Sequence, residues 1–246
     1  MERKISVAIA YYNNSSFIEK TLETLISDER INEIVITDDK SSDISVLEDI
    51  LKKKNCSKIK LFKNKNNMGC YHNKITAVMK CTNEWCILLD SDNYIETDYL
   101  DILFEINSWE RNTIYIPDRA ITFPGIPSKN MDYRKYTEQY ITKEIYINNF
   151  NNINFQCLIN TCNYFLPCKE FVLCMKDGFN TYNRKFIDCL DSAVLFTDWI
   201  CKNKIKVVKD LKYYHRLHPN SNYARGSSRQ YENSVKTQLL QRIKQI

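Results

Sequence analysis

The stretch WCILLDSDN, residues 85–93, places two aspartates one residue apart directly after a short apolar run. An apolar run of this length is typical of a buried strand. Asp90 and Asp92 would then lie at the carboxyl end of that strand, where two like charges are costly unless a cation lies close to them. Carboxylate oxygens suit hard divalent cations, so the pattern indicates a metal site.

Upstream of this stretch, apolar runs rich in β-branched residues alternate with amphipathic segments. Two of these segments begin with the pattern Ser-x-x-Glu, at Ser16 and Ser45, which is typical of a capping box at a helix N-terminus. Strands separated by helices predict an α/β fold with a central, mostly parallel sheet flanked by helices on both faces. The predicted strands are residues 5–10, 33–37, 59–62 and 86–89, and the predicted helices start at Ser16 and cover 45–51 and 71–79.

A polar cluster follows each of the four predicted strands. One such cluster alone would indicate only a turn, because Asp and Asn are common turn residues. Parallel strands bring their carboxyl ends to one edge of a sheet, where α/β proteins bind ligands, so the four clusters together predict a ligand site. The clusters are Tyr12-Asn13, Asp38-Asp39, Asn67 with Gly69, and Asp90-Ser91-Asp92.

The alternation fades after residue 110. Residues 117–127 hold three prolines and predict an irregular loop, and the Asn-rich residues 145–154 predict an exposed segment. A helix is predicted at residues 189–199 and a short strand at 205–208. The polar tail, residues 223–246, predicts a mobile segment followed by a short helix.

Composition bounds the class of protein. The chain of 246 residues is 43% hydrophobic and 26% charged, which is typical of a globular protein with one sizeable core. No apolar run approaches the ~18 residues that a membrane span requires. We therefore expect a soluble, unexported, cytoplasmic protein without a transmembrane segment, and peripheral association with a membrane stays open. The net charge of +5 is mild, and we expect no nucleic-acid partner.

Cysteine and glycine usage argues against three kinds of protein or site. Ten cysteines are scattered along the chain with no secretory signal, which indicates reduced thiols rather than a disulfide framework. No G-x-G-x-x-G occurs among the four glycines, which argues against a dinucleotide dehydrogenase. The cysteines that come closest to a metal cluster lack the paired spacing of zinc sites and are predicted to be structural: Cys157, Cys162, Cys168 and Cys174.

Four patches in the right order resemble the family-2 glycosyltransferases of the GT-A fold: ISVAIAYYNN (5–14), EIVITDDKSSD (33–43), NNMGCYHNK (66–74) and WCILLDSDN (85–93). The resemblance implies a glycosyltransferase that depends on Mn²⁺ or Mg²⁺. It would move a sugar, with inversion, from a nucleotide-sugar donor to an acceptor hydroxyl on a glycan, glycolipid or glycoprotein. A UDP-sugar is the expected donor, with GDP- and dTDP-sugars left open.

The resemblance also assigns site residues. Asp39 would receive the nucleobase, Asp90 the ribose and metal, and Asp92 the metal. The segment YHRLHPNSN, residues 214–222, resembles the closing segment of the family, so His218 would complete the metal shell and Arg216 would meet phosphate. The remaining nucleotide contacts that the resemblance implies are Ala10, Tyr12, Asn13, Asn67, Gly69, Lys74 and Ser91.

The catalytic base falls in FIDCLDSAVLFTDW, residues 186–199. Asp191 aligns best with the family's general base, with Asp188 and then Asp198 as alternatives. Leu190 stands where the family usually has Glu, and this departure leaves open a catalytically silent nucleotide-sugar-binding module. A nucleotidyltransferase is a further alternative, although its Gly-rich phosphate loop is missing near the first strand.

The resemblance finally suggests how the domain is divided. Residues 1–110 would form the half that binds the nucleotide sugar. Residues 111–222 would form the acceptor-binding half, which also carries the base, within the same domain. Residues 223–246 would form the polar C-terminal tail.

Overall fold

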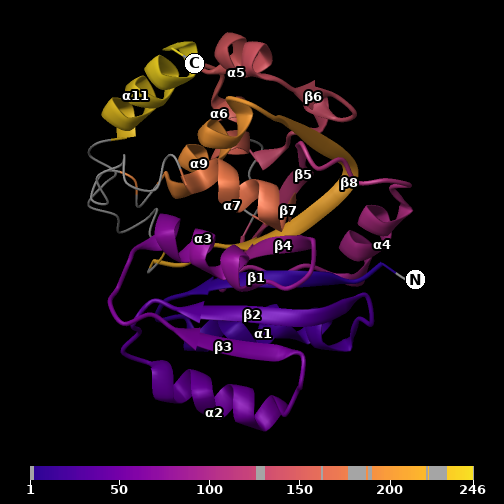
Figure 1. Cartoon of the computed structure of the whole chain (residues 1–246), viewed down its shortest axis with the longest axis vertical. Helices are drawn as coiled ribbons and strands as arrows, with labels where there is room; N and C mark the ends of the chain where they lie inside the picture. The colour runs from indigo at the N-terminus through magenta and orange to yellow at the C-terminus, as the bar shows by residue number, and fades with distance from the viewer. Residues whose placement is uncertain are drawn as a thin grey trace.

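One sheet of eight strands, in the order β3-β2-β1-β4-β7-β5-β8-β6, organises the chain (Figure 1). The computed structural model describes residues 3–125, 131–161, 163–176, 187, 190–219, 221 and 232–245. The strands are β1 Ile5–Tyr11, β2 Ile31–Asp38, β3 Ile59–Lys63, β4 Trp85–Asp90, β5 Thr113–Phe123, β6 Tyr140–Ile141, β7 Tyr164–Pro167 and β8 Lys204–Arg216. The helices are α1 Ser15–Ser27, α2 Ile44–Lys54, α3 Cys70–Lys80, α4 Thr97–Glu105, α5 Lys143–Asn149, α6 Ile153–Ile159, α7 Cys168–Lys176, α9 Asp191–Ile200 and α11 Glu232–Gln245, with a 3₁₀ turn, η2, at Arg134–Tyr136.

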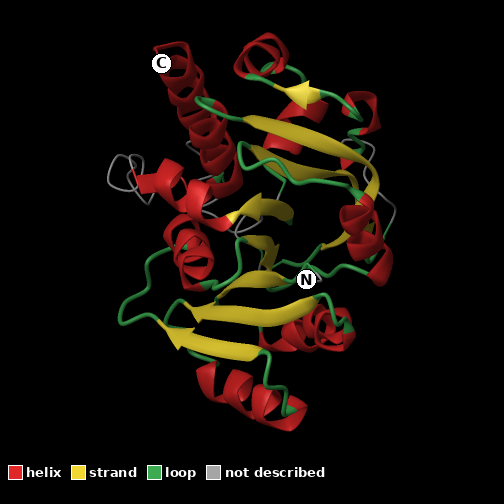
Figure 2. Cartoon of the chain, turned by 45° about the vertical axis from the view of Figure 1, so that its right-hand side comes forward, coloured by secondary structure: helices red, strands yellow, loops and turns green. Residues whose placement is uncertain are grey.

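The sheet is mostly parallel and covered on both faces, as the sequence predicted. Strand β1 pairs in parallel with β2 and β4, and β2 pairs in parallel with β3. Strand β5 pairs in parallel with β8, whereas β7 runs antiparallel between β4 and β5. Helices lie on both sides of the sheet (Figure 2). Apolar side chains of α1, α2 and α4 form one core, and those of α3, α7, α9 and α11 form the other.

The four predicted strands and the helices between them are confirmed, but the two capping boxes are wrong. The N-cap residues are Asn14 and Asp43, so Ser16 and Ser45 lie inside their helices and cap nothing. At α1 the reason is a tertiary contact, since the Asp43 carboxylate accepts hydrogen bonds from Tyr11 Oη and from the Ser15 backbone N–H, both at 2.9 Å. A carboxylate at the start of α2 thus serves the first free amide of α1. At α2 the helix begins at Ile44, one residue before Ser45.

The irregular loop predicted at residues 117–127 is wrong for residues 117–123, because β5 continues to Phe123, and residues 126–127 lie outside the described part of the chain. Pro117 is accommodated at a bulge: Pro117 pairs with Val208, but Arg119 pairs with Lys212. Within the extra turn of β8, the Asp210 backbone N–H donates to Asp118 Oδ2 at 2.8 Å. The strand predicted at 205–208 is therefore only the first part of β8, which reaches Arg216.

The Asn-rich segment forms the junction of α5 and α6 and is exposed only in part, at Asn148 and residues 151–153. Tyr146 is fully buried and Phe150 is 5% exposed, so the apolar residues of this segment belong to the core. Asn152 is an N-cap, because its side chain accepts from the backbone N–H groups of Asn154 and Phe155. The asparagines supply caps and turns between two short helices.

The predicted helix in the tail is confirmed as α11, and the residues before it, 222–231, lie outside the described part of the chain. Its buried face consists of Val235, Leu239 and Ile243. The eight cysteines in the described residues are free thiols, in agreement with the sequence. None of the helices described combines the length and apolar character that crossing a membrane requires.

One ion pair fixes α11 to the second core. Arg242 lies 3.0 Å from the carboxylate of Asp198 on α9, whose side chain is 2% exposed, and Tyr71 donates to the same carboxylate at 3.3 Å. A buried carboxylate that loses its cation is costly because its desolvation is no longer compensated.

Replacing Arg242 with Met should therefore lower the free energy of unfolding by about 3 kcal/mol, the lower end for a buried pair, because the guanidinium is partly exposed. Urea unfolding measures the change. Lys244→Met, an exposed neighbour on the same helix, is the matched control, and it should change stability by less than about 0.5 kcal/mol. Equal stability of the two variants would contradict this role of the ion pair.

Candidate active site

The carboxyl ends of β1, β2 and β4 meet at one edge of the sheet, as the sequence predicted. Ala10 at the end of β1 pairs with Thr37 of β2 on one side and with Asp90 of β4 on the other. The polar residues that follow these strands therefore start from neighbouring positions. Ala10 lies between the two strands that carry the predicted nucleobase and metal residues.

The turn that contains both aspartates is held by side chains from three other elements. The Thr21 hydroxyl on α1 lies 2.7 Å from the Asn93 carbonyl and 3.0 Å from the Ser91 carbonyl. Asn14 donates to Ser91 Oγ at 2.7 Å, and the backbone N–H of Asp90 donates to Asn163 Oδ1 at 3.1 Å. Ser91 thus faces the protein and anchors the turn.

Lys74 joins the predicted metal site to the predicted base. Its ammonium lies 2.9 Å from Asp90 Oδ1 and 2.6 Å from Asp191 Oδ2, and its side chain is 6% exposed. It also donates to Ser192 Oγ at 3.3 Å. The protein thus supplies a cation of its own to Asp90, so charge balance at the end of β4 does not by itself require a metal.

The environment of Asp191 favours proton uptake. Burial raises the pKa of the Asp191 carboxyl above its ordinary value of 3.8; Lys74 lowers that pKa, and Asp90 raises it. The net direction is upward. A carboxylate with a raised pKa is a better proton acceptor than an exposed aspartate at the same position.

Asp92 has different partners from Asp90. Its Oδ2 lies 2.8 Å from His218 Nε2, and both side chains are mostly buried. Arg216 donates from Nε to the Asp92 carbonyl at 3.1 Å, and its guanidinium packs between the rings of Phe17 and Phe123. Strand β8 therefore brings two residues predicted from the sequence, Arg216 and His218, to the turn at Asp92.

His215 is a residue of this site that the sequence did not single out. Burial lowers its pKa, while the charges of Asp92 and Asp90 raise it. The Nδ1 atoms of His215 and His218 are both buried without a hydrogen-bond partner among the described residues. The one sequence feature that could have pointed to His215 is its place beside Arg216 in YHRLHPNSN. That residue lies in the part of β8 beyond residue 208, which was not predicted.

Asp39 holds the loop before α3. Its Oδ1 accepts from Asn64 Nδ2 at 3.1 Å and from the Met68 N–H at 2.6 Å, and its Oδ2 accepts from the Gly69 N–H at 2.8 Å. Gly69 has φ of 84°, a conformation that glycine adopts without strain. Asp38 accepts from the Ser41 N–H, which makes it a turn residue.

The other predicted nucleotide contacts lie around the same edge. Tyr12 is 47% exposed just beyond β1. Asn13 binds the segment between β2 and α2, since its Oδ1 accepts hydrogen bonds from the backbone N–H and the hydroxyl of Ser42. Asn67 is half-buried in the loop that Asp39 holds. Tyr12 is thus the large exposed aromatic side chain that this edge offers to a ligand.

The alternatives for the base differ in their settings. Asp188 lies outside the described residues. Asp198 is bound to Arg242 and Tyr71 in the core and takes no part in the Lys74 cluster. Leu190, in place of the family's glutamate, is the N-cap residue of α9 and is 2% exposed. The position has become part of the apolar core.

The predicted metal ligands fit a hard cation in their chemistry. Two carboxylates with an imidazole are a donor set that Mn²⁺ accepts. The Nδ1 atom of His218 is buried and makes no hydrogen bond to the described residues. The ligand atoms of Asp90, Asp92 and His218 do not all lie within 4.8 Å of one another, and Asp90 Oδ1 lies 2.9 Å from the Lys74 ammonium. A bound cation would compete with Lys74 for that carboxylate.

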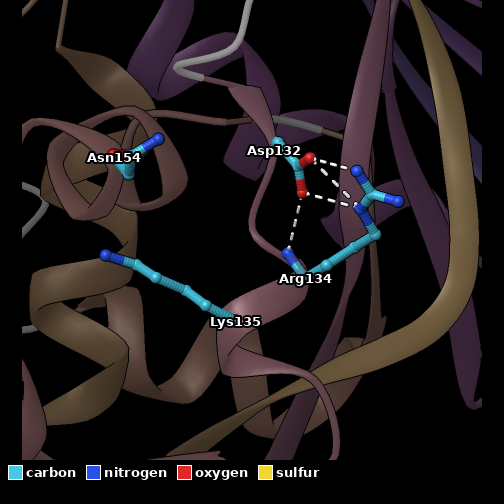
Figure 3. A pocket seen from close by; sticks show the side chains of 4 residues that line it. All are labelled: Asp132, Arg134, Lys135 and Asn154. Atoms are coloured by element: carbon cyan, nitrogen blue, oxygen red, sulfur yellow. Dashed lines mark hydrogen bonds and ion pairs between the residues drawn. The ribbon is translucent and has the colours of Figure 1, made fainter.

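A hollow between η2 and α6 is separate from these residues. Its lining is Asp132, Arg134, Lys135 and Asn154, and the guanidinium of Arg134 is bound to Asp132 (Figure 3). None of the four was predicted from the sequence. Since its guanidinium is already paired, Arg134 offers less charge to a ligand than its position suggests.

Solved structures show the same fold at low sequence identity. S. aureus TarS 1-349 in complex with UDP-GlcNAc gives a TM-score of 0.66 at 17% identity, over 96% of this chain and 65% of that chain. GalNAc-T7 with UDP, GalNAc and Mn²⁺ gives 0.64 at 15%, over 96% and 51%. The mannosyltransferase PcManGT from Pyrobaculum calidifontis, with GDP-Man and Mn²⁺, gives 0.63 at 13%, over 89% and 59%. This chain thus spans between half and two thirds of their length.

The sequence comparisons add the family. No curated protein matches the sequence. The sequence model of glycosyl transferase family 2 matches residues 6–166, which include all four strand ends that bear the predicted donor residues. With the GT-A architecture and this match over more than half of its length, the chain belongs to glycosyl transferase family 2.

Proposed function

We propose that this protein is a metal-dependent, inverting glycosyltransferase that uses a nucleotide-sugar donor, with a UDP-sugar as the first choice. The observation that carries the proposal is the contact of one buried ammonium, Lys74, with both Asp90 and Asp191. Asp90, predicted to bind the donor, and Asp191, predicted to activate the acceptor, therefore contact the same side chain. Transfer requires that proximity.

The proposed donor pocket lies between Tyr12 and Asp39. Asp39 Oδ2 accepts one hydrogen bond, from Gly69, and a carboxylate oxygen has room for a second. The imide N–H of uracil is a donor of the right kind, and the exposed ring of Tyr12 offers a stacking surface. TarS and GalNAc-T7, which share the fold, were crystallised with UDP ligands, which supports uracil without deciding it.

Asp92, His218 and Asp90 would hold the divalent cation. When bound, the cation supplies positive charge against the diphosphate leaving group. Lys74 contacts both Asp90 and Asp191, so it would keep its contact with Asp191 when Asp90 helps to hold the cation. Arg216, fixed between Phe17 and Phe123, adds a second positive charge beside Asp92.

Asp191 would act as the general base. Its carboxylate takes the proton of the acceptor hydroxyl, the oxygen forms a bond to the anomeric carbon, and the bond from that carbon to the diphosphate oxygen breaks with its electron pair. A single displacement of this kind inverts the anomeric centre. Residues 111–222 would provide the acceptor side, for a glycan, glycolipid or glycoprotein hydroxyl.

The proposal predicts selective stabilisation by donor and metal together. In a panel of UDP-, GDP- and dTDP-sugars, UDP-sugars with Mn²⁺ should raise the melting temperature, because a ligand at one hundred times its Kd stabilises by about 2.7 kcal/mol. Differential scanning fluorimetry measures the shift, and product analysis with the best donor measures hydrolysis or transfer. Stabilisation without any turnover would favour the silent binding module instead.

Two aspartate variants serve as controls for that panel. Asp92→Ala should abolish the part of the shift that depends on Mn²⁺, because it removes a proposed ligand from the turn after β4, outside the apolar core. Asp49→Ala, an exposed aspartate on α2, should leave the shift unchanged. If the Asp92 variant keeps the full metal-dependent shift, the metal assignment is wrong.

Asp191→Asn keeps the shape of the side chain and removes its basicity. Turnover should fall about 10²–10⁴-fold, as expected when a general base is lost, with donor affinity preserved. Steady-state kinetics with calorimetric donor binding separates the two effects. Asp188→Asn is measured in parallel, and a large loss in that variant alone would transfer the role to Asp188.

Lys74→Met should move the acid limb of the pH–rate profile to higher pH. The base works deprotonated, so turnover falls as pH drops through the raised pKa of Asp191, and removing Lys74 removes the charge that lowers this pKa. The readout is kcat at saturating donor across pH. An unshifted limb with a lower plateau would mean that Lys74 acts on the donor alone.

A further inference from the structure

Three thiols meet on the face of the sheet that α3 and α7 cover. Cys81 follows the last residue of α3, Cys86 lies in β4 and Cys168 is the first residue of α7. Their sulfur atoms all lie within 4.8 Å of one another. Among the described histidine, cysteine, aspartate and glutamate side chains, no other group of three or more is so compact.

This thiol triad, Cys81, Cys86 and Cys168, is separate from the donor site. Cys86 pairs with Ser6 near the start of β1, whereas Asp90 pairs with Ala10 near its end. Four residues along a strand correspond to about 13 Å. The triad therefore lies at the opposite end of β4 from the turn that holds the predicted metal ligands of the donor.

The backbone holds the triad in place. The Cys168 N–H donates to the Glu84 carbonyl at 2.9 Å, and Cys86 pairs with Leu166 across β4 and β7. Cys86 is fully buried and Cys168 is 7% exposed, while Cys81 is half-buried. The site is shielded by the core, and Cys81 provides its access to solvent.

The surroundings favour a thiolate at Cys168. Hydrogen bonds from the Cys81 and Cys86 thiols lower the pKa of Cys168, although its burial raises that pKa. The positive end of the α7 dipole acts in the same direction. The carboxylate of Glu33 opposes this, but it is itself paired with Lys60 at 2.7 Å.

We propose that the thiol triad is a binding site for one soft, thiophilic cation, monovalent copper, held by three sulfur ligands. Thiolates select soft ions, and structural zinc sites use four ligands where this group offers three. Metal–sulfur bonds of about 2.3 Å in a trigonal site place the sulfurs about 4 Å apart, so the triad needs only a small contraction. Each sulfur that coordinates as a thiolate releases its proton to solvent, and copper keeps its oxidation state.

The bound ion would join α3, β4 and α7 at one point. Cys81 and Cys86 are close in sequence, but Cys168 comes from a distant segment, so the full ligand set exists only in the folded chain, which the ion would stabilise by mass action. The sequence could not indicate this, since it drew attention to Cys168 together with Cys157, Cys162 and Cys174. In the structure Cys168 instead contacts Cys81 and Cys86.

The test is an anaerobic titration of the full, reduced, metal-free chain with Cu(I), delivered in competition with a chromophoric Cu(I) chelator. The parent protein should take one equivalent from the chelator, with a thiolate-to-copper absorption band and a higher melting temperature. Cys81→Ser and Cys168→Ser should each weaken that equivalent at least tenfold. Cys56→Ser, at a half-buried cysteine just after α2, is the matched control and should bind as the parent does.

Three results would overturn the proposal. The first is a parent chain that takes no copper from the chelator, and the second is undiminished binding in both triad variants. The third is tighter binding of Zn²⁺ than of Cu(I) in the same competition format. The melting curve of each variant without metal shows whether it is folded, and Cys81→Ser keeps the test decisive if Cys168→Ser fails to fold, because Cys81 is half-buried.

Discussion

The buried ammonium of Lys74 is the interaction on which the site depends. An isolated pair of carboxylates at the ends of β4 and at the start of α9 would repel and would resist burial. Lys74 places a positive charge between these two mostly buried carboxylates, at 2.9 Å from Asp90 and 2.6 Å from Asp191. It reaches them from α3, and the start of α3 is itself fixed by Asp39 through Gly69. Three of the strand-end clusters are thus connected through one helix.

Much of the fold could be predicted because its first half obeys local rules. Short β-branched runs, each followed by a polar turn and an amphipathic helix, read correctly as β1 to β4 with α1 to α3 between them. The second half could not be read in this way. Pro117 signals a loop in any local scheme, and only the pairing of β5 with β8 shows that a bulge absorbs it. The same holds for the capping box predicted at Ser16, because Asp43, from a turn distant in sequence, binds the first free amide of α1.

The candidate site, like the fold, could be predicted only where local sequence rules apply. Asp39, Asp90 and Asp92 could be named because they follow strands whose order fixes where they lie. The contacts that give these residues their properties join positions far apart in the chain, such as Asp92 with His218 and Lys74 with Asp191. His215 was missed because the strand that carries it was predicted to end at residue 208. The thiol triad was missed because its members belong to three different elements.

The bulge opposite Pro117 also constrains how the length of this chain can vary. Between the pairs Pro117–Val208 and Arg119–Lys212, β5 advances by two residues and β8 by four. The excess is even, so the alternation of side chains between the two faces of the sheet is the same before and after the bulge. Loss or gain of one residue there would exchange the faces of Tyr213 and Tyr214 and carry Arg216 away from Asn93, whose side chain accepts its backbone N–H. Homologues that vary here should therefore differ by two residues at a time.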